Sequence, residues 1–116
     1  YRNNDNCLIE ILSKIKFTKS EIGSSVSCSG TCLSLENYKS NLSKFYISKE
    51  TLNKTHFKSS AKGDLINLEL PLKKGQKISG HICQGHVDFF SKVKKIKLID
   101  KSYLIEFLTN NSQKKI

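Results

Sequence analysis

The segment SSVSCSGTCLSL at residues 24–35 alternates small polar and apolar side chains on both sides of a Ser-Gly pair. Serines alternate with Val26 and Cys28 before the pair, and Leu33 and Leu35 alternate with polar residues after it. A period of two is typical of β-strands, and a Ser-Gly pair at the break is typical of a sharp change of direction. This segment therefore predicts two strands joined by a bulge or tight bend at Ser29-Gly30.

The remaining segments also predict short strands. We expect them at residues 7–12, 44–47, 65–70, 80–87, 92–99 and 102–108, with polar turns at 36–43 and at Asp100-Lys101. Pro71 cannot donate to a ladder and should end the strand before it. Ser48 is a good N-cap for one short helix with Glu50 in its first turn and Leu52 facing inward. The pattern predicts an all-β barrel or sandwich.

A second segment, SGHICQGHVD at residues 79–88, places His81 and His86 each after a glycine, with Cys83 between them. Glycines in a strand pattern allow close approach of another backbone, so this segment could line a cavity. The simpler alternative is a strand end with structural histidines. A metal site that combines these three residues with Cys28 or Cys32 is disfavoured, because strand alternation puts His86 on the other face. No metal is expected.

Composition limits the class of protein. The chain has 116 residues, 37% of them hydrophobic, which suits one small domain, and no apolar run has a transmembrane length. The net charge is +10, but Arg2 is the only arginine among 20 basic residues, and nucleic-acid readers favour arginine. We expect no specific nucleic-acid partner and no membrane. The four cysteines match no zinc spacing and are expected to be reduced thiols in a cytoplasmic protein.

An internal repeat links the two ends of the chain. Residues 8–12 read LIEIL and residues 104–108 read LIEFL. If this match is a true repeat, the chain contains one whole unit and the beginning of a second copy.

Four segments together resemble riboflavin synthase, the family built from tandem lumazine-binding barrels. They are GSSVSCSGTCLSL (23–35), KETLNKT (49–55), GDLINLE (63–69) and GHICQGHVD (80–88), and they occur in the family's order. The resemblance implies a six-stranded Greek-key β-barrel for each repeat. It divides the chain into a first barrel at 1–91 and the start of a second at 92–116.

The resemblance also implies an activity. Two molecules of 6,7-dimethyl-8-ribityllumazine would be converted to riboflavin and 5-amino-6-ribitylaminopyrimidinedione, the last step of riboflavin biosynthesis. No cofactor is required, and the whole enzyme would be a homotrimer whose sites form between barrels of neighbouring subunits. The alternative is a barrel that binds lumazine or flavin without turnover. Non-catalytic relatives carry Asn where this chain has His86, which favours the enzyme.

Site roles follow by position in the matching segments. Ser25, Cys32 and His86 are the expected catalytic residues. The expected substrate-binding residues are Ser34, Lys49, Glu50, Thr51, His81 and Val87.

The chain departs from the family at its ends. It begins after the family's first strand and includes little of the second barrel, so we expect it to lack half of an active site. One hypothesis is that residues 92–108 fold back, or exchange between chains, to complete the first barrel.

Overall fold

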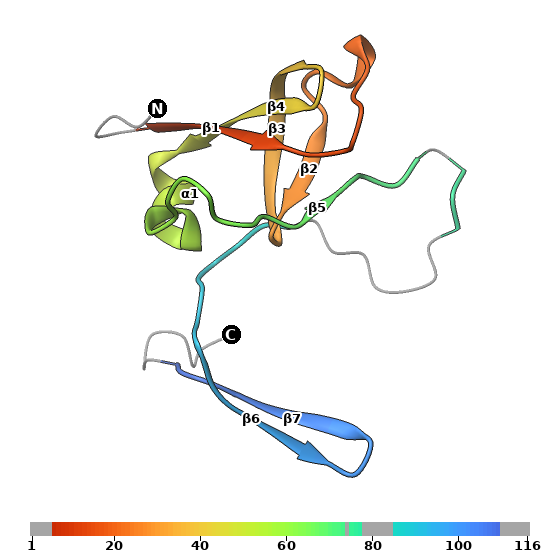
Figure 1. The fold of residues 1–116 in the computed structure, drawn as a ribbon. Helices are drawn as coiled ribbons and strands as arrows, with labels where there is room; N and C mark the ends of the chain where they lie inside the picture. Colours follow the sequence, from red (N-terminus) through yellow and green to blue (C-terminus); the bar gives the residue numbers. More distant parts are fainter. Residues whose placement is uncertain (1–5, 74, 78–84, 110–116) are drawn as a thin grey trace.

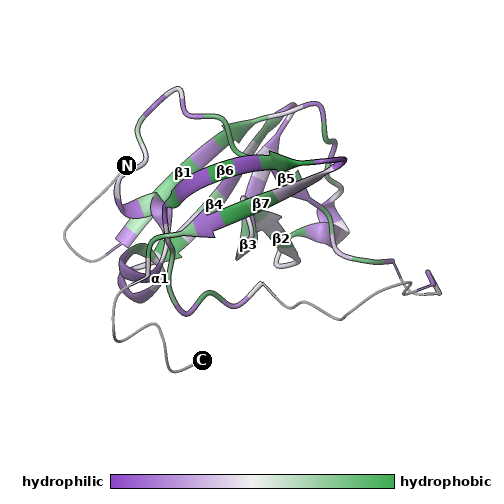
Figure 2. Ribbon diagram, turned by 90° about the horizontal axis from the view of Figure 1, so that it is seen from below, coloured by the Kyte–Doolittle hydropathy of each residue, from purple (hydrophilic) through white to green (hydrophobic). Residues whose placement is uncertain are grey.

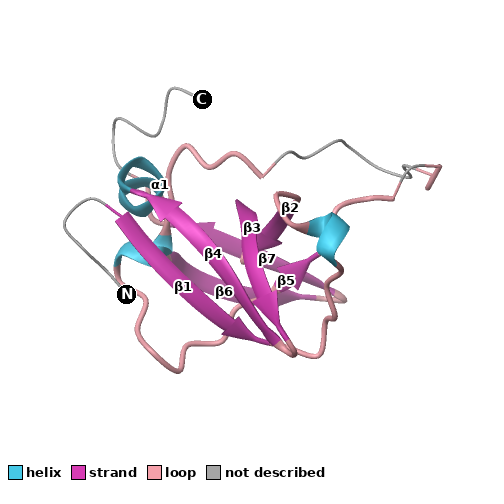
Figure 3. Cartoon of the chain, turned by 90° about the horizontal axis from the view of Figure 1, so that it is seen from above, coloured by secondary structure: helices cyan, strands magenta, loops and turns pink. Residues whose placement is uncertain are grey.

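A computed structural model describes residues 6–73, 75–77 and 85–109. The chain runs through β1 (Asn6–Leu12), the 3-10 turn η1 (Lys19–Glu21), β2 (Ser25–Cys28), β3 (Thr31–Lys39), β4 (Leu42–Ser48), α1 (Lys49–Lys54), the 3-10 turn η2 (His56–Lys58), β5 (Leu68–Glu69), β6 (Val93–Ile99) and β7 (Ser102–Phe107). Figure 1 shows them along the chain, and Figure 3 shows how strands dominate. The prediction of an all-β protein with a short helix is confirmed.

The main sheet has five strands in the order β1-β4-β3-β2-β5, and every neighbouring pair is antiparallel. Strand β3 pairs with β2 through Thr31–Ser34 and with β4 from Leu35 onward, with a register shift between Leu35 and Asn37. A strand that changes partners at a bulge turns the corner of a curled sheet. Within the described residues, β1 and β5 remain separate edges, so the closed six-stranded barrel stays a prediction.

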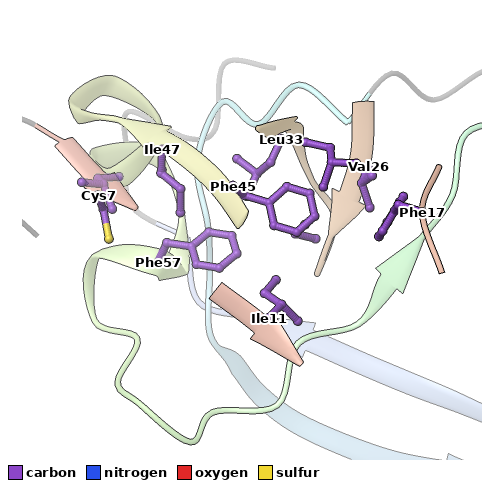
Figure 4. Close-up of a cluster of buried hydrophobic side chains, with 11 residues drawn as sticks. Cys7, Ile11, Phe17, Val26, Leu33, Phe45, Ile47 and Phe57 are labelled. Carbon is purple, nitrogen blue, oxygen red and sulfur yellow. The ribbon is translucent and has the colours of Figure 1, made fainter. Parts of the chain in front are cut away.

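The core lies on one side of this sheet. Val26, Leu35, Phe45 and Ile47 are fully buried, and Phe57 from η2 covers them. Figure 4 shows these side chains converging from different strands. Phe17, which lies between β1 and η1, is buried in the same cluster.

Helix α1 forms where the sequence predicts it. The Ser48 side-chain oxygen accepts a hydrogen bond from the Thr51 backbone N–H at 3.2 Å, which satisfies a donor left free by the first turn. Lys54 and Glu50 form an i,i+4 ion pair of 2.8 Å, and Leu52 is buried. None of the helices in the described part of the chain is long and apolar enough to span a bilayer.

Three local predictions were wrong. Residues 36–43 are not a turn, because β3 continues to Lys39 and the chain reverses at Ser40, which has a φ of 56°. The polar residues of this segment lie mostly exposed on a strand whose backbone pairs with β4. The strand expected at 65–70 is reduced to Leu68–Glu69, the two residues that pair with β2. In the predicted strand 80–87, residues 85–87 are not a strand, and residues 80–84 lie outside the described part.

Strands β6 and β7 form a separate C-terminal hairpin, which confirms the strands predicted there and the turn at Asp100-Lys101. Every residue of both strands is exposed. Figure 1 shows the hairpin away from the main sheet, and Figure 2 shows apolar bands alternating along it. The fold-back of residues 92–108 is therefore not observed: β6 pairs with β7, and in the described part of the chain β1 pairs with β4.

The matching sequences at residues 8–12 and 104–108 allow the exposure of corresponding side chains in β1 and β7 to be compared. Aligning 8–12 with 104–108 places Ile9 with Ile105 and Ile11 with Phe107. Ile11 is buried and Ile9 packs against the core, whereas Ile105 is 45% exposed and Phe107 56% exposed. The C-terminal hairpin thus has a core-type face without a core beneath it among the described residues.

This difference can be measured with one substitution in each repeat. We expect Ile11→Ala to lower the free energy of unfolding by about 2–4 kcal/mol, because it leaves a cavity in a packed core. Phe107→Ala should change it by less than about 0.5 kcal/mol, because the ring is exposed. Urea unfolding of both variants tests this, and an equal loss in both would show that the hairpin packs on a core.

Candidate functional site

The β2–β3 hairpin separates a core face from a polar face. Its two-residue turn places Ser29 and Gly30 at φ values of 48° and 83°, the positive angles of a tight hairpin turn. The resulting register pairs Ser25 with Ser34 and Ser27 with Cys32. Cross-strand partners point to the same side of a sheet, so these four side chains share one face.

We call this set, Ser25, Ser27, Cys32 and Ser34, the serine-rich face. Ser25 and Ser34 are exposed, and Ser27 and Cys32 are half-buried. The opposite face holds the buried Val26, Cys28, Thr31, Leu33 and Leu35. The serine-rich face is lined with small side chains, which leave space, and with hydroxyl groups, which can both donate and accept hydrogen bonds. It suits a flat ligand with polar ring atoms.

Residues 85–88, which we call the strap, contact this face at one point. The Cys32 backbone N–H donates to the Gly85 carbonyl oxygen at 3.1 Å. Gly85 has a φ of 74°, and a Cβ built on it would lie 3.1 Å from the Cβ of Cys32. The backbone angle therefore favours glycine here, and an added Cβ would crowd Cys32. His86 follows directly, so its Cα lies about 3.8 Å from that of Gly85.

The structure thus brings together part of the predicted site. Ser25, Cys32 and Ser34 share a face, and the strap carries the exposed His86 and the half-buried Val87 to its edge. His81 lies outside the described residues.

The other predicted ligand-binding residues lie on helix α1, which packs against β1 and β4 and η2. Lys49 and Glu50 are exposed there. Thr51 is half-buried and its hydroxyl lies 3.1 Å from that of Ser48, so it also supports the helix cap. The hydrogen bond and charge of Lys54 lower the pKa of Glu50, which favours a carboxylate at the start of the helix.

Sequence reasoning missed three residues near these groups. Ser27 belongs to the serine-rich face, which strand parity alone could have shown. Lys54 and Asp88 interact electrostatically: Glu50 contributes most to the raised pKa of Lys54, and the charge of Asp88 adds to it. No local pattern indicates this second relation, because the two residues belong to separate segments.

The described cysteines, Cys7, Cys28 and Cys32, are free thiols. Burial raises the pKa of Cys28 to about 12, so this thiol stays protonated at neutral pH, whereas Cys32 is partly accessible. Residues 6–73, 75–77 and 85–109 contain no group of three or more metal-type side chains close enough to hold an ion. Among the described cysteines, Cys32 is the one that is partly exposed, and it lies on the serine-rich face.

These features define an antiparallel β domain whose curled sheet presents a face of small polar side chains beside a histidine-bearing strap. The chain belongs to the lumazine binding domain family, whose model matches residues 2–71. This match confirms the family indicated by the four sequence segments.

Three similar curated proteins are riboflavin synthases. The chain is 33% identical over 93 residues to the riboflavin synthase of Buchnera aphidicola from Schizaphis graminum, covering 80% of this chain and 45% of that protein. It is 33% identical to the riboflavin synthase of Escherichia coli, covering 80% and 44%. The riboflavin synthase of Saccharomyces cerevisiae is 30% identical, covering 66% and 32%. The chain therefore spans less than half the length of these relatives.

The contact at Gly85 gives a prediction with an internal control. We expect Gly85→Ala to destabilise the fold more than Gly63→Ala and to speed hydrogen exchange of the Cys32 amide. Both glycines have positive φ, but a Cβ at Gly63 would meet no atom within 4 Å. Amide exchange measured by NMR compares the two. Equal stability and equal Cys32 amide exchange in the two variants would mean that the strap is not in close contact with Cys32.

The raised pKa of buried Cys28 makes the free energy of unfolding depend on pH. Its pKa is raised from 9.0 to about 12 in the fold, so above pH 9 the unfolded chain loses this proton first and stability falls. We expect this thiol alone to reduce the free energy of unfolding by up to about 1.4 kcal/mol per pH unit between pH 9 and 12. Urea unfolding of the parent chain and Cys28→Ala should give a shallower pH slope for the variant. Parallel slopes would contradict the assignment.

Proposed function

We propose that this chain is the lumazine-binding part of a riboflavin synthase. The complete enzyme would convert two molecules of 6,7-dimethyl-8-ribityllumazine to riboflavin and 5-amino-6-ribitylaminopyrimidinedione. The observation that carries the proposal is the serine-rich face with the strap bonded to Cys32, in a chain of the lumazine binding domain family. The relatives' shared name favours the enzyme over a barrel that binds lumazine or flavin without turnover.

In this proposal the serine-rich face receives the ring system. The Ser25 and Ser34 side chains are cross-strand neighbours, about 5 Å apart at Cβ, and offer hydroxyls to ring heteroatoms. The small residues allow the flat ring to approach the sheet. Val87 of the strap adds apolar contact, and His81 is assigned to substrate binding in the same segment. Lys49, Glu50 and Thr51 bind the ring edge or the ribityl chain.

The chemistry needs a proton acceptor and a nucleophile. The 7-methyl group of one lumazine must lose a proton, and His86, which follows the Gly85 bonded to Cys32, is a suitable base or hydrogen-bond donor. A nucleophile adds to the ring of the other lumazine, and Cys32, Ser25 and water are the candidates. Much of the rate would come from holding the two lumazines face to face.

The serine-rich face would bind one of the two lumazines. We propose that a second barrel supplies the other half and that the complete protein is a homotrimer. Two observations support a division into a first barrel at 1–91 and a second repeat from 92 onward. The β7 sequence repeats that of β1, and the core-type side of β7 is apolar although exposed. A cytoplasmic location is consistent with the free thiols of Cys7, Cys28 and Cys32.

Ligand binding tests the proposal without requiring turnover. We expect saturable changes in fluorescence when the chain is titrated with 6,7-dimethyl-8-ribityllumazine or with riboflavin. Ser34→Val should weaken binding about fivefold, as expected for the loss of a hydrogen bond of about 1 kcal/mol. Thr51→Val should also weaken it.

Ser102→Val is the matched control, because Ser102 is an exposed strand serine on the C-terminal hairpin. It should bind like the parent chain. A folded sample that shows no saturable binding of either ligand would overturn the proposed function. Equal weakening by the Ser34 and Ser102 substitutions would overturn the position of the site.

A further inference from the structure

Strand β5 lies beside β2 at one end of the described sheet, and hydrogen bonds fix its position there (Figure 1). Glu69 of β5 lies opposite Ser27 of β2. Before this pair in β5, the Ser29 N–H donates to the Asn67 carbonyl oxygen at 2.8 Å, and the Asn67 N–H donates to the Ser29 hydroxyl oxygen at 3.1 Å. These two bonds continue the same antiparallel register, so the β2–β3 turn holds the strand that carries Glu69.

Glu69 lies on the same side of the sheet as the serine-rich face. Its neighbour Leu68 lies opposite the buried Cys28 and packs against the core. Side chains alternate along a strand, so Glu69 points to the outer side, as its partner Ser27 does. In agreement with this, Glu69 is exposed and Ser27 is half-buried. The serine-rich face therefore continues from β3 through β2 onto β5.

Three side chains of different chemistry form a row across these strands. Cys32 lies opposite Ser27, and Ser27 lies opposite Glu69. The Cys32 N–H is bonded to Gly85 and not to β2, so Cys32 and Ser27 are a non-hydrogen-bonded pair, whose Cα atoms approach to about 4.5 Å. Two strand spacings, about 10 Å, separate Cys32 from Glu69. A thiol, a hydroxyl and a carboxylate thus follow one another across the face.

The carboxylate of Glu69 adds a kind of hydrogen-bonding group that the serine-rich face does not contain. Its two oxygens can accept from two donors at once, whereas the Ser27 hydroxyl beside it can donate or accept. In the described part of the chain, the ion pairs join other residues, so this carboxylate is open to a ligand. Two acceptors beside a hydroxyl suit a chain of neighbouring hydroxyl groups, which must each donate a hydrogen bond.

We propose that Glu69 and Ser27 bind the ribityl chain of the ligand and so select a ring that carries a polyhydroxyl chain. The Glu69 carboxylate accepts from hydroxyls of the chain, and the Ser27 hydroxyl bonds to the chain where it leaves the ring. This assignment rests on the proposed function, because it gives a direction to the ligand of that site. The ring lies beside Cys32 and Ser34, and the ribityl chain runs toward β5.

The order of the strands gives a second consequence. Helix α1 packs against β1 and β4, whereas β5 lies at the other end of the order β1-β4-β3-β2-β5. A ligand centred on β3 with its ribityl chain toward β5 turns its ring toward α1. Lys49, Glu50 and Thr51 would then meet the ring edge and not the ribityl chain.

Two ligands that differ only in the ribityl chain test the proposal by fluorescence titration. In 6,7,8-trimethyllumazine, a methyl group replaces the ribityl chain of 6,7-dimethyl-8-ribityllumazine. We expect Glu69→Gln to weaken binding of the ribityl compound about five- to tenfold, because a charged acceptor is lost, and Ser27→Ala to weaken it about two- to fivefold. Binding of the trimethyl compound should change by less than about twofold in both variants.

A matched substitution and a stability measurement are the controls. Glu36→Gln removes the same charge from an exposed position of β3, beyond the residues of β3 that pair with β2. It should leave the ratio of the two affinities unchanged. Glu69 and Glu36 are both exposed, so both glutamine variants should unfold at the same urea concentration as the parent chain. A change in the affinity ratio then reports on the ligand and not on the fold.

The outcomes separate this assignment from the proposed function. If the parent chain binds both compounds equally, or if Glu69→Gln weakens both by the same factor, the ribityl chain does not lie on β5, although lumazine binding still supports the proposed function. A changed affinity ratio in Glu36→Gln alone would place the chain on the other side of Ser34 and would also overturn the assignment. If the parent chain binds neither compound, the proposed function and this assignment both fail.

Discussion

Strand β3 pairs with two partners along its length while its side chains alternate between two environments. Its first half pairs with β2 and its second half with β4, and the change at Leu35 to Asn37 bends the sheet around the core. Leu33 and Leu35 are buried on the inner side, so Cys32 and Ser34 must point outward. A shift of one residue would bury the polar set and expose the leucines, so core packing fixes the candidate site.

On the outer side of β3, the strap packs closely against Cys32. The strap approaches Cys32 through a glycine whose Cβ, if present, would lie 3.1 Å from the cysteine Cβ. His86 follows this contact directly in the chain and is exposed, while Cys28 of the same hairpin points into the core and stays protonated. Two cysteines of one hairpin therefore differ in their access to solvent because they lie on opposite faces.

Local patterns predicted the local features of this fold. The alternation in residues 24–35 predicted the hairpin and its faces, and Ser48 predicted the start of α1, because these depend on neighbours in sequence. The polar composition of residues 36–43 predicts a turn, whereas β3 continues to Lys39, because polar side chains on an exposed strand resemble a loop in composition. The Cys32–Gly85 bond and the relation of Lys54 to Asp88 join distant segments, and no periodicity indicates them.

The central claim is that the serine-rich face receives the ring of 6,7-dimethyl-8-ribityllumazine. The most direct measurement is the rate of alkylation of each cysteine by iodoacetamide, followed by mass spectrometry with and without saturating ligand. A ring lying on this face should slow the labelling of the half-buried Cys32, while Cys7 and Cys28, which are buried in the core, label slowly in both conditions. An unchanged Cys32 rate in a sample that binds the ligand would place the ring elsewhere and contradict the account.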